Sequence, residues 1–272
     1  MKTKDKLATN VLFIIMVLVI LYPLLFILGN SFKPLQEAYQ TVLNLIPLNF
    51  TVENFTYLFG SIPILKITWN TFFIATVVTL SKLLISFFAA YVLTFHKFKG
   101  KRALYFTIIG TMFIPFTVTM IPNYLMMANI NLIDNSWGVI IPQVADGMGI
   151  FLLTQTMRGI PKTLIEAAKV DNISEKRIMS HIVLPLTRHG ITSTGIWFFI
   201  TSWNEYVWPV LILKSTEQYT LPLAMQNYIS AEGGTNFTVA MAISLITMIV
   251  PLSLYIIFQK YIIGTFVSSG IK

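Results

Sequence analysis

Long runs of apolar residues are the feature that most limits what this chain can fold into. Six segments are each about as long as an α-helix must be to cross a ~30 Å hydrocarbon core. Only 11% of the residues are charged, and the apolar residues do not alternate as they would in barrel strands. We therefore predict an all-α membrane protein in a single domain, residues 1–272, with six transmembrane helices. These helices are predicted at Val11–Gly29, Thr68–Phe95, Ala103–Ile121, Trp137–Met157, Ile191–Leu213 and Thr238–Ile263.

The positions of the basic residues predict how these helices are oriented, because Lys and Arg concentrate in the cytoplasmic loops of membrane proteins. On one side lie fifteen of the 19 basic residues: Lys2, Lys4, Lys6, Lys97, Lys99, Lys101, Arg102, Arg158, Lys162, Lys169, Lys176, Arg177, Arg188, Lys260 and Lys272. The other side has only Lys33, Lys66 and Lys214, and Lys82 lies within a predicted helix. Both termini are therefore predicted to be cytoplasmic, and the surplus of positive charge reflects topology rather than a nucleic-acid partner.

The outward connections are polar and nearly uncharged, which predicts ordered surface rather than tails. They are Ser31–Ile67, Pro122–Ser136 and Lys214–Phe237. The first helix follows three lysines, as a signal peptide would, but its apolar block is long and no small-residue cleavage site follows it. We predict that this helix is not cleaved.

Several chemistries find no support in the sequence. The chain has no cysteine, which excludes disulfides and thiol catalysis. His96, His181 and His189 are not grouped at metal-ligand spacing, so no metal site is predicted. An intramembrane enzyme is the least supported class of function, because the predicted helices contain neither HExxH nor paired aspartates of the Gly-x-Gly-Asp type.

The longest inward loop, Arg158–Gly190, is too polar for the membrane and too regularly patterned for a linker. Pro161 suits the first turn of a helix, where its missing N–H is not needed. The run that ends at Val170 then predicts a helix carrying two adjacent alanines. Asp171 and Asn172 predict a turn, because both residues tolerate a left-handed backbone.

A second short helix is predicted after this turn. Ser174 is placed to cap it, and the helix would run through Ile178 and Ile182 until Pro185 ends it. The loop is thus predicted to be a helix–turn–helix elbow on the cytoplasmic face. An amphipathic hairpin that lies on the lipid surface is the alternative.

The stretch from Glu166 to Ser174, continuing to Leu184-Pro185-Leu186, resembles the EAA loop of importer permeases of the ATP-binding-cassette superfamily. The sequence departs from that motif at Asn172, where glycine is usual, and at His189, where proline is usual. The resemblance extends over nearly the whole chain and is to the carbohydrate-uptake branch, related to the maltose-transporter permeases. The segments that carry it further are Ser31–Pro34, Ile121–Tyr124, Trp203–Tyr206 and Gly264–Lys272, while Trp203–Ile212 and Glu232–Ala242 resemble the glycerol-3-phosphate permeases.

This resemblance implies a permease subunit in a bacterial cytoplasmic membrane, working with two ATP-binding-cassette ATPase subunits, a second homologous permease and an extracytoplasmic solute-binding protein. The chain has no GxxxxGK[ST] phosphate loop, so ATP and Mg are expected on the ATPases and no cofactor on this chain. The elbow would dock on an ATPase through Glu166, Ala167, Ala168, Asp171, Asn172 and Ile178.

Charged residues within the predicted helices are candidates for the translocation path, because charge at membrane depth usually faces a cavity or a partner. The charged candidates are Lys82, Asp146 and Glu205, and the polar residue Asn204 beside Glu205 is a fourth candidate. Lys82 lies on a stripe of small and polar residues, which could equally be a helix-packing face. In that case Lys82 would pair with Asp146 or Glu205. A proton-coupled secondary transporter using Asp146 and Glu205 is the rival function.

Overall fold

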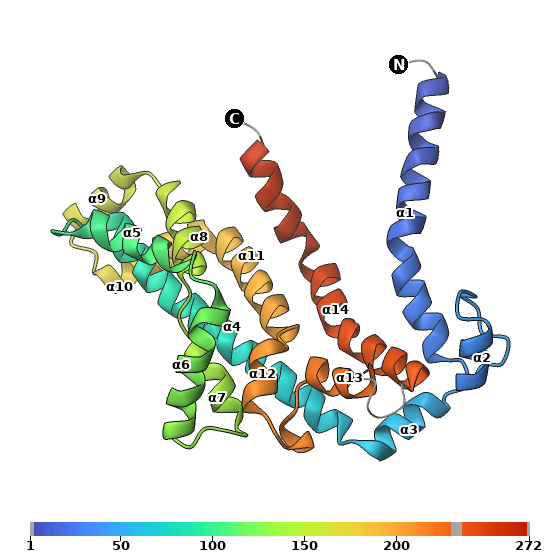
Figure 1. Cartoon of the computed structure of the whole chain (residues 1–272). Helices are drawn as coiled ribbons and strands as arrows, with labels where there is room; N and C mark the ends of the chain where they lie inside the picture. The colour runs from blue at the N-terminus through green and yellow to red at the C-terminus, as the bar shows by residue number, and fades with distance from the viewer. Residues whose placement is uncertain (1–2, 230–235, 271–272) are drawn as a thin grey trace. The chain divides into compact units, whose positions relative to one another are not determined.

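The computed structural model describes residues 3–229 and 236–270, and this part of the chain is helical without any strand (Figure 1). The α-helices are α1 Thr3–Ser31, α2 Leu35–Gln40, α3 Glu53–Ser61, α4 Ile64–Phe95, α5 Lys101–Thr111, α6 Phe116–Asn129, α7 Ser136–Ile140, α8 Gly147–Arg158, α9 Lys162–Val170, α10 Glu175–Arg177, α11 Leu184–Trp203, α12 Val207–Ile212, α13 Leu221–Ile229 and α14 Phe237–Gly270. Two 3₁₀ turns, η1 Ile141–Gln143 and η3 Thr216–Gln218, and a π-helical segment, η2 Ile178–Val183, complete the order. The predicted all-α class is confirmed.

The chain divides into two compact units. The first comprises Met1–Thr68 and Leu221–Val250, and the second comprises Trp69–Thr220 and Pro251–Lys272. The single-domain organisation stays a prediction. The candidate elbow and the charged residues of the predicted helices all belong to the second unit.

Three helices in the described residues are long and apolar enough to cross a membrane: Thr9–Ser31 within α1, the whole of α4, and Phe237–Gln259 within α14. They contain most of the first, second and sixth predicted transmembrane helices. The apolar side chains of α1, from Val11 to Leu21, are exposed, as expected of a surface that contacts lipid rather than water.

The third predicted helix, Ala103–Ile121, is wrong as a single straight element. The chain ends α5 at Thr111 and begins α6 at Phe116, with a bend of 92° between them. Pro115 lies at this break with an extended backbone, because proline lacks the N–H that would continue the helix and disfavours helical geometry in the residue before it. Helix α6 continues past Pro122 to Asn129, so the predicted outward connection from Pro122 is also partly helix.

The fourth and fifth predicted helices are also interrupted. The fourth bends by 48° between Ser136–Gln143 and Gly147–Arg158, and the fifth ends at Trp203 before the short helix α12 resumes at Val207. By length and composition, the described residues therefore supply three to five crossings. The count of six stays a prediction.

The first of the connections predicted to face outward, Ser31–Ile67 in the first unit, is folded around buried polar groups. The Lys33 side chain is fully buried, and its Nζ donates to the carbonyl oxygens of Thr41 at 2.8 Å and Asn44 at 2.5 Å. The Glu37 carboxylate accepts hydrogen bonds from the backbone N–H groups of Leu48 and Asn49. Because buried polar groups are stable only when paired, this connection is ordered, as predicted.

Candidate functional site

The elbow, residues 158–190, begins as the sequence predicts. Helix α9 starts directly after Pro161, and Asn172 adopts the left-handed backbone with a φ of 56°. The backbone N–H of Ile173 bonds back to the carbonyl of Ala168, which closes the turn. The turn at Asp171 and Asn172 is confirmed.

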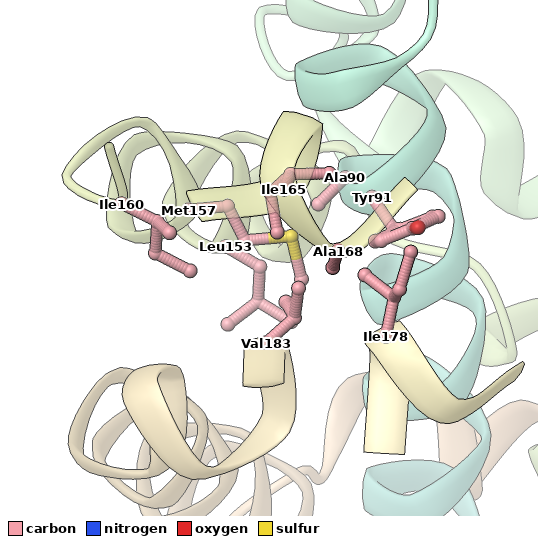
Figure 2. Close-up of a cluster of buried hydrophobic side chains, with 9 residues drawn as sticks. All are labelled: Ala90, Tyr91, Leu153, Met157, Ile160, Ile165, Ala168, Ile178 and Val183. Atoms are coloured by element: carbon pink, nitrogen blue, oxygen red, sulfur yellow. The ribbon is translucent and has the colours of Figure 1, made fainter. Parts of the chain in front are cut away.

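A cluster of buried side chains fixes the elbow to the rest of the second unit (Figure 2). Its members come from α4, from the C-terminal part of α8, from the connection between α8 and α9, from α9 and from η2: Ala90, Tyr91, Leu153, Met157, Ile160, Ile165, Ala168, Ile178 and Val183. Close packing of this kind resists displacement. The elbow is therefore part of the second unit's core rather than a loose hairpin.

This cluster separates the predicted coupling residues into two groups. Glu166, Ala167, Asp171 and Asn172 are exposed, and they stay candidates for contact with a partner. Ala168 is only 5% exposed and Ile178 is fully buried. Docking through Ala168 would require an exposed side chain, and that expectation was wrong, because Ile165 and Ala168 share the inner face of α9. Ala168 and Ile178 hold the elbow together from inside.

The second half of the elbow differs from the prediction. Ser174 is at the N-cap of α10, but its side chain makes no capping hydrogen bond. Pro185 does not end the helix, because the chain passes through the π-helical segment η2 into α11, with proline in the first turn of α11. A π-turn shifts the hydrogen-bond register, and a proline in a first turn has no bond to lose.

Glu175 joins the elbow to the end of α4 and was missed as a functional residue. Its Oε1 lies 2.8 Å from Lys169 Nζ and 3.5 Å from His96 Nε2, and its Oε2 accepts a hydrogen bond from the Tyr91 hydroxyl. The bond from Lys169, followed by that from Tyr91, lowers the pKa of Glu175. The sequence signal that could have indicated this contact is Tyr91, a hydrogen-bonding side chain near the inward end of the predicted transmembrane helix Thr68–Phe95.

Three of the four translocation candidates line one cavity of about 590 Å³ in the second unit. Lys82 comes from α4, Asp146 from the start of α8, and Glu205 from the break between α11 and α12. Asn204 is exposed and donates instead to the carbonyl of Ile200. Further polar lining residues, which the sequence did not single out, are Thr111, Thr119, Asn123, Gln143, Thr201 and Ser202.

Lys82 and Asp146 form an ion pair, with Nζ and Oδ2 separated by 3.0 Å. Asp146 also caps α8, because its Oδ1 accepts the backbone N–H groups of Met148 at 2.8 Å and Gly149 at 3.3 Å. The Lys82 ammonium lies 5.1 Å from the centre of the Phe198 ring. The sequence left open whether Lys82 pairs with Asp146 or lines the translocation path. In the structure Lys82 forms this ion pair and also lines the cavity.

Glu205 has a local role as well. Its Oε1 accepts the backbone N–H of Trp208 at 3.2 Å, at the start of α12. Two other lining residues carry buried polar atoms without a hydrogen-bond partner, Ser202 Oγ and Trp208 Nε1. Buried polar atoms are normally paired, so these two are unusual within the wall of the cavity.

The small-residue stripe around Lys82 is mainly a packing surface. Ala75 and Ser86 are fully buried and Thr79 is 7% exposed. A Cβ atom at Gly149 would lie 2.5 Å from Ser86 Oγ and 2.4 Å from Phe198 Cζ. The N-terminal end of α8 thus approaches α4 and α11 closely, as small residues allow in membrane proteins.

Comparison with known proteins gives consistent matches. The arabinooligosaccharides transport system permease protein AraQ of Halalkalibacterium halodurans is 31% identical over 92% of this chain and 91% of its own length. The sn-glycerol-3-phosphate transport system permease protein UgpE of Yersinia enterocolitica is 28% identical over 96% of this chain and 95% of its own length.

A solved structure supports the fold. It is the crystal structure of a bacterial ABC transporter involved in the import of the acidic polysaccharide alginate, with a TM-score of 0.84 and 24% identity over 96% of this chain and 98% of that one. A family model, "Binding-protein-dependent transport system inner membrane component", matches residues 82–264, well over half of the chain and including the whole elbow and the cavity charges. The chain therefore belongs to the family of inner membrane components of binding-protein-dependent transport systems.

Proposed function

We propose that this chain is the permease subunit of an ATP-driven importer that moves a carbohydrate-type solute, such as a sugar, an oligosaccharide or glycerol-3-phosphate, into the cell. The elbow carries this proposal: Glu166 and Ala167 are exposed on a helix whose opposite face is buried in the second unit's core. A movement of a cytoplasmic partner bound to the exposed face could therefore be transmitted to the second unit, because α9 is packed rigidly into its core.

The partners would be two ATPase subunits, a second homologous permease and an extracytoplasmic solute-binding protein. ATP and Mg would be bound by the ATPases alone, with no cofactor and no enzymatic step on this chain. Both termini would lie in the cytoplasm, consistent with the distribution of basic residues.

The substrate class rests on the relatives and on the cavity wall. The named relatives transport arabinooligosaccharides and sn-glycerol-3-phosphate, both rich in hydroxyl groups. The unpaired Ser202 and Trp208 atoms could bond to hydroxyl groups, and Lys82 supplies a positive charge for a phosphate.

Uptake in a strain that lacks this gene tests the proposal. Labelled monosaccharides, oligosaccharides and glycerol phosphates are supplied in turn, and uptake of one class should disappear and return with the plasmid-borne gene. Import should persist when a protonophore collapses the proton gradient while ATP is maintained. Import that instead follows the proton gradient would favour the secondary transporter. That rival has less support, because both oxygens of Asp146 are already bonded to donors.

A further inference from the structure

Four basic side chains meet where the ends of α4 and α8 lie near the beginnings of α5 and α9. Lys101, Arg102 and Arg158 line a cavity of about 620 Å³. Lys101 and Arg158 also line a neighbouring cavity of about 260 Å³, together with Lys162. All of these residues belong to the second unit and to the predicted cytoplasmic side.

No carboxylate balances this charge within residues 3–229 and 236–270. Neither cavity has an Asp or Glu in its lining, and none of the described ion pairs involves the four cations. Burial, followed by the charges of Lys162 and Arg158, lowers the pKa of Lys101. An anion between these side chains would relieve their mutual repulsion.

A second observation concerns the smaller cavity. Its lining includes Thr94, which is only 8% exposed and whose Oγ1 has no hydrogen-bond partner. Lys101 Nζ already donates to the carbonyl oxygens of His96 at 2.8 Å and Thr94 at 3.4 Å, which fixes the ammonium at this position. A buried hydroxyl without a partner, beside a fixed cation, is suited to donate to a phosphate oxygen.

Apolar groups complete the larger cavity. Leu93, Phe98 and Phe106 line it, and Phe98 and Phe106 are 40% and 56% exposed. The Arg102 guanidinium lies 5.7 Å from the centre of the Phe106 ring, and that of Arg158 lies 4.8 Å from the centre of the Tyr105 ring. Cations beside exposed apolar rings match a molecule with an anionic head and hydrocarbon chains. Basic pockets between membrane helices on the cytoplasmic side bind such lipid headgroups.

We propose that these two adjoining cavities form a binding site for the phosphate headgroup of an anionic phospholipid of the cytoplasmic leaflet, with its acyl chains against Phe98 and Phe106. The site would anchor the beginning of the elbow to the membrane surface. Neither the cavity around Lys82 and Asp146 nor the proposed ATPase contact includes these residues.

The test uses the whole transporter complex, reconstituted in phosphatidylcholine vesicles with or without phosphatidylglycerol. The phosphatidylglycerol retained after detergent extraction is counted by native mass spectrometry. Arg158→Gln with Lys162→Gln should weaken retention roughly 30-fold, since each basic residue near an anionic lipid contributes about a fivefold effect. Thr94→Val, which keeps the shape of the side chain, should weaken it a few-fold.

The matched control is Lys97→Gln with Lys99→Gln, which removes the same charge from exposed residues that line neither cavity. This control should retain the lipid normally, and equal loss in both double variants would overturn the proposal.

Displacement of the lipid by inorganic phosphate alone would identify free phosphate as the ligand instead. Normal lipid retention with loss of the ATPase would identify an acidic protein partner, which also overturns it. If the double variant fails to reach the membrane, Lys162→Gln alone should still show the fivefold effect.

Discussion

At the scale of single residues, the pairing of Lys82 with Asp146 leads to a prediction about stability and transport. Lys82→Met leaves the Asp146 carboxylate without its cation, at a site where the side chains are only 14% and 23% exposed. Removal of one partner of a buried pair costs about 3–5 kcal/mol, and the partial exposure here favours the lower end. We expect less protein in the membrane and little uptake, measured by blot and by transport assay.

The double variant Lys82→Met with Asp146→Asn separates the structural role from the transport role. Asparagine can still accept the N–H groups of Met148 and Gly149, and no charge is left unpaired. Membrane levels should therefore recover. If Lys82 contacts the solute, uptake or preference for the solute stays altered. Full recovery of transport would mean that the pair is structural only.

Gly149 provides a second prediction at this scale. Gly149→Ala places a methyl group 2.4 Å from Phe198 Cζ and 2.5 Å from Ser86 Oγ, so α8 or these two side chains must shift. Overpacking of this kind typically costs about 1–3 kcal/mol. We expect a lower Tm in detergent. Gly110→Ala is the control, because a Cβ there meets nothing within 4 Å, and a similar loss in both variants would contradict the explanation.

At the scale of elements, the two faces of α9 predict opposite results for neighbouring alanines. Ala167→Trp and Glu166→Lys alter the exposed face, so the chain should stay in the membrane at normal levels while uptake and co-purification of the ATPase are lost. Ala168→Trp forces an indole into the buried cluster, so the chain itself should be destabilised. The measurement is a pull-down with a parallel membrane blot. Normal ATPase recovery from the first two variants would remove the main support for the coupling role.

The link between Glu175 and α4 predicts a dependence on pH. The pKa of Glu175 is lowered from its ordinary value of 4.5, first by the bond from Lys169 and then by that from Tyr91. Its ionised form is thus favoured in the folded elbow. This stabilisation is present above pH 4.5 and is lost as the pH falls through the lowered pKa.

A spin label can follow this change, because the chain has no cysteine and Val170, in α9, is 80% exposed. A label on Val170→Cys should become more mobile only below pH 4.5. Adding Glu175→Gln should give high mobility at every pH, while Glu166→Gln, on the exposed face, should keep the normal profile. Identical profiles in all three proteins would show that Glu175 does not hold the elbow.

At the scale of the whole molecule, the charge distribution predicts the topology. A reporter fused after Lys272 should be cytoplasmic, and one inserted near Gly233 should be outside. Both positions lie outside the described residues, but the prediction depends only on the basic residues. Reporter activity and protease protection in intact cells check it, and two reporters on the same side would contradict the count of six crossings.

The fold class and the family could be predicted from the sequence, because the patterns that indicate them are local. The apolar blocks require a membrane whatever their order in space. The left-handed turn at Asn172 follows from the side chain and its neighbours. The motif around Glu166 is contiguous in the sequence, so the family resemblance depends on no tertiary contact. Composition and local pattern are sufficient where each residue's preference agrees with the fold.

The tertiary structure decided which residues face one another. Lys82 and Asp146 are 64 residues apart, and no local pattern shows that they pair. The 92° bend before Phe116 and the passage of the chain through Pro185 depend on how neighbouring turns accommodate a proline. Ala168 is buried because α4 and η2 cover one face of α9. Packing between distant segments sets these features, so the sequence determined the class of protein and the tertiary structure determined the geometry of its sites.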